Sequence, residues 1–119
     1  MKRTFLICPV RGHSMEETEA IVKKLERKGW VVHWPLRDTN QDDPTGLKIC
    51  DQNRIAIARA DEVHVIWDGQ SEGCLFDLGM AWALRKPLTI ISLPSLTTGK
   101  SFQNMVTAWE KASNAKEAK

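Results

Sequence analysis

Short apolar runs rich in β-branched residues alternate along this chain with longer segments of helical periodicity. The short runs predict buried strands at residues 3–9, 30–34, 62–67 and 87–92. Between and after them, the spacing of apolar residues predicts helices between Ser14 and Gly29, and at about 45–60, 74–86 and 101–115. Ser14 begins a capping box with Glu17, and Gly29 is placed to end the first helix.

Strands and helices alternate along the whole chain, and this order is typical of an α/β protein. Two parallel strands joined by a helix form a right-handed unit, so helices are expected to cover a parallel sheet. The sequence predicts a three-layer sandwich with a parallel sheet of four to five strands, in the flavodoxin-like (Rossmann-like) order 2-1-3-4. Residues 1–115 form one domain in this interpretation, and residues 116–119 form a frayed tail.

The predicted helix at 74–86 has almost no polar face, and one acid, Asp77, stands in its first turns. Asp77 shares a stripe with Met80 and Leu84, so its carboxylate faces the protein or a cleft. Ligands of such sheets bind at the carboxyl ends of strands, where the loop 68–73 lies. The helix start favours the ionised acid. Two interpretations stay open: a functional carboxylate, or an acid that only interacts with free amides.

Asn53 lies in the middle of the apolar face of the helix at 45–60, beside Ala56 and Ile57. Burying an unpaired amide is costly, so its side chain needs a partner. The backbone at the end of the first or third strand and a bound ligand are both candidates. Asp51 lies at the margin of the same face.

Two loops at the same edge of the predicted sheet carry groups suited to an anion. The loop DGQSEG at 68–73 offers backbone amides, the Ser71 hydroxyl and Gly73, next to a helix start that suits a phosphate. Arg11 and Gly12 follow the first strand, and arginine is suited to clamping phosphate or carboxylate. A solvated turn and a plain surface charge are the alternatives for these two loops.

The segment TTGKS at 97–101 lies between a strand and a helix, as a P-loop does. A P-loop needs glycine at position 94, which is Pro94, so this kind of ATPase is excluded and Ser101 is predicted to cap the last helix. Trp34 and Trp67 end two predicted strands and are assigned to packing, with stacking on a base as the alternative.

Charge and composition narrow the range of partners and cofactors. The net charge of +2 equals that of residues 111–119 alone, with three Lys and one Glu, so the body is near neutral and a nucleic-acid-binding face is not expected. No membrane span or signal peptide is recognisable, which predicts a cytoplasmic protein. Three unpaired cysteines (Cys8, Cys50 and Cys74) and scattered histidines predict reduced thiols and no metal site.

Taken together, these residues resemble the nucleoside 2-deoxyribosyltransferase superfamily, including its branch of deoxynucleoside-monophosphate N-glycosidases. The resemblance spans most of residues 3–105. Its most specific part is SEGCLFDLGMAWALRKP at 71–87, which is similar to the family pattern S-x-G-x-x-x-E-L-G-x-A-x-A-x-x-K-P. The resemblance implies that Asp77 stands where the family has its nucleophilic Glu. It also implies that Ser71 and Gly73 belong to the loop that contacts phosphate or sugar.

The same resemblance implies further correspondences. Arg11 and Gly12 match the end of an Ile-Arg-Gly segment of the glycosidase branch, and Asn104 matches an Asn that completes a neighbouring subunit's site in the transferases. Asn53 stands where the family commonly has an Asp. Asn53 cannot take a proton, and Asp77 is one methylene shorter than Glu. Asp51, two residues from Asn53, is a candidate substitute for the lost acid.

The resemblance implies cleavage or transfer at the N-glycosidic bond of a (deoxy)nucleoside or nucleoside 5′-monophosphate. Asp77 would be the nucleophile, Asn53 would orient the sugar or Asp77, and neither a metal nor a redox cofactor would be needed. The alternative, motivated by the two departures, is a non-catalytic nucleotide-binding module of the same fold. A purely structural protein is a third possibility, but it leaves the polar loops unused.

The helix at 74–86 is apolar over more of its surface than one sheet face can cover. Phe76 and Trp82 lie away from the stripe that carries Asp77. The sequence therefore predicts a homodimer or higher homo-oligomer with subunit contacts near the site.

Overall fold

Four parallel strands form a single sheet in the order β2-β1-β3-β4. The computed structural model describes residues 1–10 and 14–117. The strands are β1 (Arg3–Ile7), β2 (Val31–His33), β3 (Glu62–Ile66) and β4 (Leu88–Ser92). Each strand falls within a predicted run. The parallel sheet, its order and its flanking helices confirm the predicted α/β fold.

The helices are α1 (Met15–Arg27), α2 (Pro35–Asp38), α3 (Leu47–Arg59), α4 (Glu72–Ala83) and α5 (Phe102–Glu117). The sequence predicted all of them except α2, which is too short to show a periodicity. Pro35 occupies the first turn of α2, where its missing N–H is tolerated. The backbone N–H of Trp34 donates to Asp38 Oδ2 at 2.9 Å, which closes the turn.

The helix ends follow local signals, with several differences from the prediction: α4, for example, begins at Glu72 and ends at Ala83, where residues 74–86 were predicted. Ser14 Oγ accepts from the Glu17 N–H at 3.3 Å, and Gly29 has a φ of 100°, so both predicted ends of α1 are confirmed. The start of α3 is later than expected, because Gly46 precedes it in the left-handed conformation. Helix α5 continues to Glu117, two residues beyond its predicted end at about Ala115.

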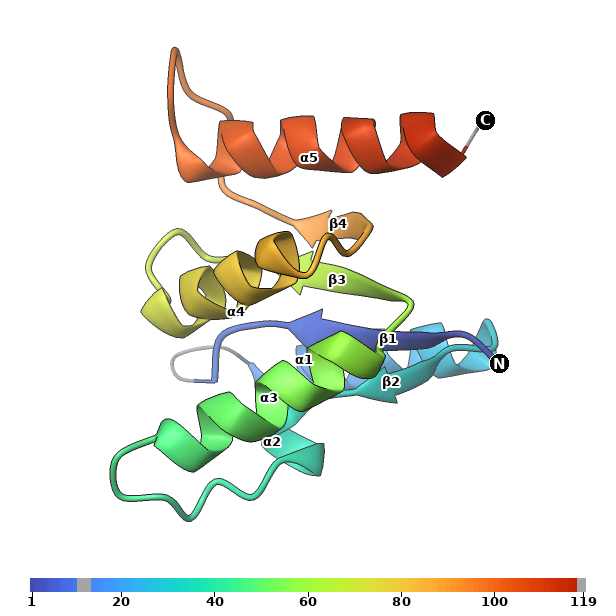
Figure 1. The fold of residues 1–119 in the computed structure, drawn as a ribbon, viewed down its shortest axis with the longest axis vertical. Helices are drawn as coiled ribbons and strands as arrows, with labels where there is room; N and C mark the ends of the chain where they lie inside the picture. Colours follow the sequence, from blue (N-terminus) through green and yellow to red (C-terminus); the bar gives the residue numbers. More distant parts are fainter. Residues whose placement is uncertain (11–13, 118–119) are drawn as a thin grey trace.

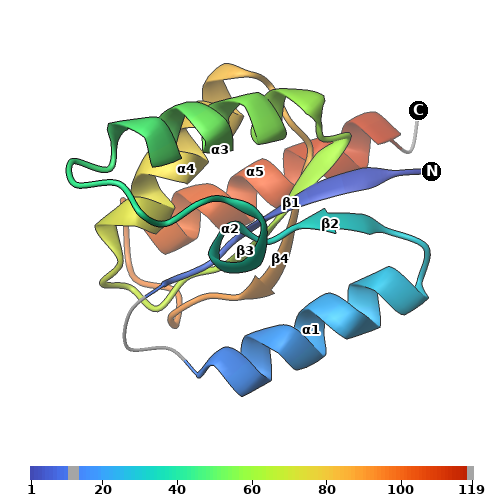
Figure 2. The ribbon, with the colours of Figure 1, turned by 90° about the horizontal axis from the view of Figure 1, so that it is seen from below.

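Helices cover both faces of the sheet, and the alternation along β1 shows which residues face which layer. Phe5 and Ile7 point into a core shared with α3, α4 and α5, whereas Leu6 points into a core shared with α1. Figures 1 and 2 show α1 on one side of the sheet and α3 and α4 on the other. Two apolar clusters, one on each face, therefore hold the three layers together.

The carboxyl ends of the strands meet at one edge, where two buried tryptophans secure the loops. Trp34 and Trp67 are 5% and 6% exposed, which confirms that they pack in the core. Trp67 Nε1–H donates to the Ser71 carbonyl at 3.2 Å, and its ring meets Phe102 edge-on at 6.0 Å. Trp67 thus ties the loop before α4 to the start of α5. No helix among the described residues is long and apolar enough to cross a membrane.

Candidate active site

Asp77 is the sixth residue of α4 and lies partly buried at the carboxyl edge of the sheet. Burial raises the pKa of its carboxyl to about 7, while a hydrogen bond from the Asn53 side chain acts in the opposite direction. The expectation that the helix start keeps Asp77 ionised is wrong, because the helix dipole acts mainly within the first turn. At neutral pH the side chain is therefore divided between its two protonation states.

Asn53 comes from α3 and is buried, with 6% of its surface exposed. Its Oδ1 accepts a hydrogen bond from Thr39 Oγ1 at 3.0 Å, and its side chain also bonds to Asp77. The expected need for a polar partner is thus met by two side chains. Asp51 is exposed and pairs with Arg54 at 3.4 Å, on the outside of α3. Asn53, and not Asp51, is therefore the α3 residue that contacts Asp77.

All three cysteines lie close enough to Asp77 for its charge to affect their thiols. Burial raises the pKa of Cys8 to about 12 and that of Cys74 to about 11, and it also raises the pKa of Cys50; the negative charge of Asp77 adds to each rise. The thiols are free, as predicted, and they stay protonated. The three thiols near Asp77 are thus neutral groups. No group of three or more His, Cys, Asp or Glu in the described part of the chain could hold a metal ion.

The loop before α4 is held in one conformation by its own side chains. Asp68 Oδ1 accepts from the backbone N–H groups of Gln70 at 2.9 Å and Ser71 at 2.8 Å. Gly69 has a φ of 82°, and a Cβ there would lie 3.0 Å from Pro94 Cγ, so this position requires glycine.

Ser71 and Gly73, the predicted binding residues of this loop, lie at the N-terminus of α4. Ser71 Oγ caps the helix by accepting from the Cys74 N–H at 3.3 Å. A Cβ at Gly73 would meet only Ser71 Oγ, at 3.8 Å, and Gly73 is exposed. A ligand can therefore approach the first turn of α4, on the same helix as Asp77.

Among the other predicted binding residues, Asn104 is the one that the structure describes, and it is not brought into this cluster. Arg11 and Gly12 lie outside the described residues. Asn104 holds the loop before α5: its Oδ1 accepts from the Thr97 N–H at 3.0 Å, and its Nδ2 donates to the carbonyls of Thr97 and Gly99, both at 2.7 Å. Within one chain Asn104 supports this loop, and its role in a neighbouring subunit stays a prediction. Ser101 caps α5 as expected, by accepting from the Asn104 N–H at 3.1 Å.

Two residues near the site, Thr39 and His33, gave no signal in the sequence. Thr39 is buried, bonds to Asn53 and lies 2.8 Å from His33 Nε2. It was part of a polar stretch assigned to a loop, and the unpredicted helix α2 brings it beneath α3. A single threonine in a polar stretch belongs to no repeating pattern of apolar residues, so the sequence did not indicate that Thr39 would be buried.

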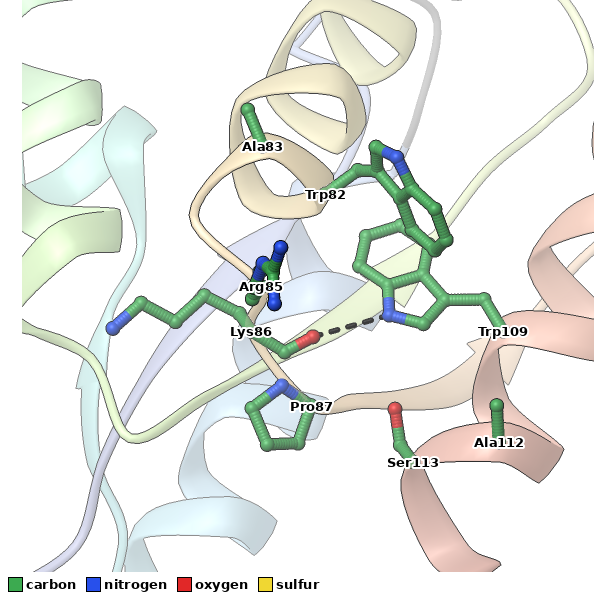
Figure 3. A pocket seen from close by; sticks show the side chains of 8 residues that line it. All are labelled: Trp82, Ala83, Arg85, Lys86, Pro87, Trp109, Ala112 and Ser113. Atoms are coloured by element: carbon green, nitrogen blue, oxygen red, sulfur yellow. Dashed lines mark hydrogen bonds between the residues drawn. The ribbon is translucent and has the colours of Figure 1, made fainter. Parts of the chain in front are cut away.

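A cavity of about 590 Å³ lies at the other end of α4, away from Asp77. Figure 3 shows Trp82 and Trp109 side by side above the segment that leads into β4; their rings meet edge-on at 5.3 Å. Trp109 Nε1–H donates to the Lys86 carbonyl at 3.1 Å. Because Lys86 and Pro87 precede β4, this cavity lies at the amino edge of the sheet. It is therefore separate from the Asp77 cluster.

The raised pKa of Asp77 predicts that Asp77→Asn stabilises the fold at neutral and higher pH. The folded carboxyl titrates near pH 7 and the unfolded one near its ordinary value of 3.8, so ionisation favours unfolding increasingly as pH rises between those values. We expect the variant to melt roughly 5 °C or more above the wild type at pH 8, with the difference vanishing near pH 4. Thermal melts of both proteins across this range measure it, and a variant that is less stable at pH 8 would contradict the burial of Asp77.

Comparison with known protein families gives one match that spans most of the chain. The family described as nucleoside 2-deoxyribosyltransferase has a sequence model that matches residues 5–108. This range contains most of β1, all of β2 to β4, helix α4 with Asp77, and the start of α5. The comparison with curated proteins found no match.

Two solved structures share the fold. One is a 2-deoxyribosyltransferase from the psychrotolerant bacterium Bacillus psychrosaccharolyticus, with a TM-score of 0.68 and 19% identity over 94% of this chain and 90% of that one. The other is the CMP N-glycosidase BcmB of Clostridium botulinum, with a TM-score of 0.59 and 22% identity over 92% of this chain and 84% of that one. At these identities the likeness concerns the fold.

Proposed function

The chain belongs to the nucleoside 2-deoxyribosyltransferase family, and we propose that it cleaves or transfers the N-glycosidic bond of a nucleoside or nucleoside 5′-monophosphate. One observation carries the proposal: a partly buried carboxyl, Asp77, is held by the Asn53 amide at the carboxyl edge of a parallel sheet. This edge is where α/β proteins bind ligands. Family membership then supports a sugar C1′ as the atom that meets the carboxylate.

In the proposed reaction, the ionised form of Asp77 attacks C1′ as the bond to the base breaks. The electron pair of that bond leaves with the base, which takes up a proton. The transition state resembles an oxocarbenium ion, whose positive charge the carboxylate stabilises. Water or a second base then attacks C1′ and releases Asp77. The hydrogen bond from Asn53 favours the ionised form that begins this cycle.

Ser71, Gly73, Arg11 and Gly12 are proposed to bind the phosphate or the sugar. The capped and exposed N-terminus of α4 supports this role for Ser71 and Gly73, because helix starts favour anions. For Arg11 and Gly12 the proposal rests on the sequence alone. The similar solved structures include a CMP N-glycosidase, which supports placing 5′-monophosphates among the candidate substrates.

Incubation with matched nucleosides and 5′-monophosphates, with detection of free base, tests the proposed function. We expect base release, and faster release from 5′-monophosphates, because a phosphate adds charge-assisted hydrogen bonds. Arg11→Ala should remove the preference for monophosphates, whereas Arg85→Ala, at the opposite end of α4, should keep it. Equal rates for both substrate forms in the wild type would remove the phosphate site from the proposal.

A non-catalytic nucleotide-binding module is the second candidate. Two features favour it: an uncharged Asn53 where the family commonly has an acid, and an Asp77 that is only partly ionised at neutral pH. A module of this kind would bind nucleotides in calorimetry and release no base from any of them. The same incubation therefore separates the two candidates.

We further propose that the protein is a homodimer that uses the outer faces of α4 and α5. Phe76 and Trp82 of α4 are 55% and 63% exposed, and Phe102 and Met105 of α5 are about half exposed. Large apolar side chains gathered on adjacent helices are typical of subunit interfaces.

Light scattering at tens of micromolar should give twice the 13.5 kDa mass of one chain. Phe76→Glu should give the monomer mass, because it places a charge in the apolar contact, whereas Glu19→Gln on the opposite face should leave the dimer intact. A monomer mass for the wild type would contradict the proposal.

A further inference from the structure

Three side chains from different elements form a continuous series of hydrogen bonds that ends at Asp77. His33 Nε2 lies 2.8 Å from Thr39 Oγ1, and Thr39 Oγ1 donates to Asn53 Oδ1 at 3.0 Å. The Asn53 side chain in turn bonds to Asp77. Thr39 and Asn53 are 3% and 6% exposed, so water cannot readily replace these partners.

The number of protons available along this series decides which group donates and which accepts in each hydrogen bond. A threonine hydroxyl has one proton, and that of Thr39 is used on Asn53 Oδ1. Thr39 Oγ1 can therefore only accept from His33, so Nε2 of His33 carries a hydrogen. With Oδ1 occupied, Asn53 presents its NH₂ group to Asp77. The reverse arrangement, with His33 bearing its hydrogen only on Nδ1, would turn the Asn53 carbonyl toward the carboxylate.

We propose that Thr39 and His33 are positioning residues, which fix the side-chain amide of Asn53 so that its NH₂ group faces Asp77. This inference rests on the proposed function for its catalytic meaning, because an NH₂ donor stabilises the ionised carboxylate that attacks the sugar. A carbonyl oxygen in the same place would instead favour the protonated acid. Asn53 thereby assists Asp77 without being able to take a proton itself.

The groups near Asp77 and near His33 do not change their protonation state around neutral pH, so the hydrogen bonds from His33 through Thr39 to Asn53 keep their direction there. Among the described residues, the titratable groups whose pKa responds to Asp77 are the thiols of Cys8, Cys50 and Cys74, which burial keeps protonated. His33 faces Asp38 and Arg37, and burial lowers its pKa, so it is neutral at pH 7. Protonation of His33 at lower pH adds a hydrogen to Nδ1 and leaves the Nε2–H donor in place. The ring is held by stacking on Phe5, with centroids 5.3 Å apart.

The test follows the Asp77 carboxyl by NMR in the ligand-free protein, using ¹³C-labelled aspartate. Thr39→Val keeps the shape of the side chain and removes the hydroxyl. It should move the midpoint of the Asp77 titration upward by about one pH unit, the size expected when a hydrogen bond to a charged group is weakened. Thr39→Ser keeps the hydroxyl and should leave the midpoint nearly unchanged. His33→Phe keeps the ring stack and should give a smaller upward shift.

A second measurement keeps the proposal testable if Thr39→Val does not fold. The ¹⁵N spectrum of His33 in the wild type should show hydrogen on Nε2 at pH 8. Hydrogen on Nδ1 alone, or an unchanged Asp77 midpoint in a folded Thr39→Val protein, would overturn the proposal. Because neither measurement needs a substrate, the expected shifts without any base release would uphold the positioning role while the proposed function fails.

Discussion

Asp77→Asn is expected to lower the rate of base release by roughly a thousandfold or more, because loss of a covalent nucleophile removes the main route through the transition state. Asn keeps nearly the same shape and still accepts a hydrogen bond from Asn53. Removing a buried charge should also leave the fold intact and stabilise it above neutral pH. Ligand binding should change little. Base release, calorimetry and thermal melts on the same preparations measure the three effects.

Asp77→Glu is the matched control, since it restores the residue found in the family pattern. It keeps the charge and lengthens the side chain by one methylene, so it should retain activity or raise it. Asp77→Asn with the wild-type rate would remove Asp77 from the mechanism. Nucleotide binding by all three proteins without base release would instead favour the non-catalytic module.

The sheet was predictable because each of its strands has a clear local signal. Runs such as Glu62–Ile66 and Leu88–Ser92 are rich in β-branched residues, which predicts strands. A helix lies between successive strands, and two strands joined by a helix normally form a parallel pair with a right-handed connection. The caps at Ser14 and Ser101 were predictable for the same reason, since a cap depends on neighbours three residues away.

Helix α2 and the Thr39 contact were not predictable, because they depend on packing between distant segments. Pro35–Asp38 forms a single turn, which is below the length at which periodicity can be recognised. Thr39 and Asn53 are 14 positions apart in the sequence, and the residues that flank each of them do not predict the contact. The need of Asn53 for a partner was predictable from its apolar surroundings, but the identity of that partner was not.

The protonation state of Asp77 was also not predictable from the sequence, because it depends on burial. The sequence places an acid near a helix start, which predicts a low pKa. In the structure, burial against β1 and α3 outweighs the helix dipole and raises the pKa to about 7. Burial results from the packing of the layers, so the upward direction of the Asp77 pKa shift could be found only from the folded structure.

The pH dependence of base release should follow this pKa. Only the ionised form of Asp77 can attack C1′, so kcat/KM should be nearly constant above about pH 8 and fall about tenfold per pH unit below pH 7. At pH 5 it should lie about a hundredfold below its plateau, because about one molecule in a hundred then carries the carboxylate.

Among the described residues, the neighbouring histidines and thiols leave this profile specific for Asp77. Burial lowers the pKa of His64 to about 4 and also lowers that of His33, while the thiols near Asp77 stay protonated, so Asp77 is the group of this cluster that changes charge as pH rises from 6 to 8. The measurement should use a nucleoside, because the second ionisation of a 5′-phosphate falls near pH 6 and would add a pH dependence of its own to kcat/KM. A profile that is flat from pH 5 to 8 would mean that ionised Asp77 is not the attacking group, even if Asp77→Asn is inactive.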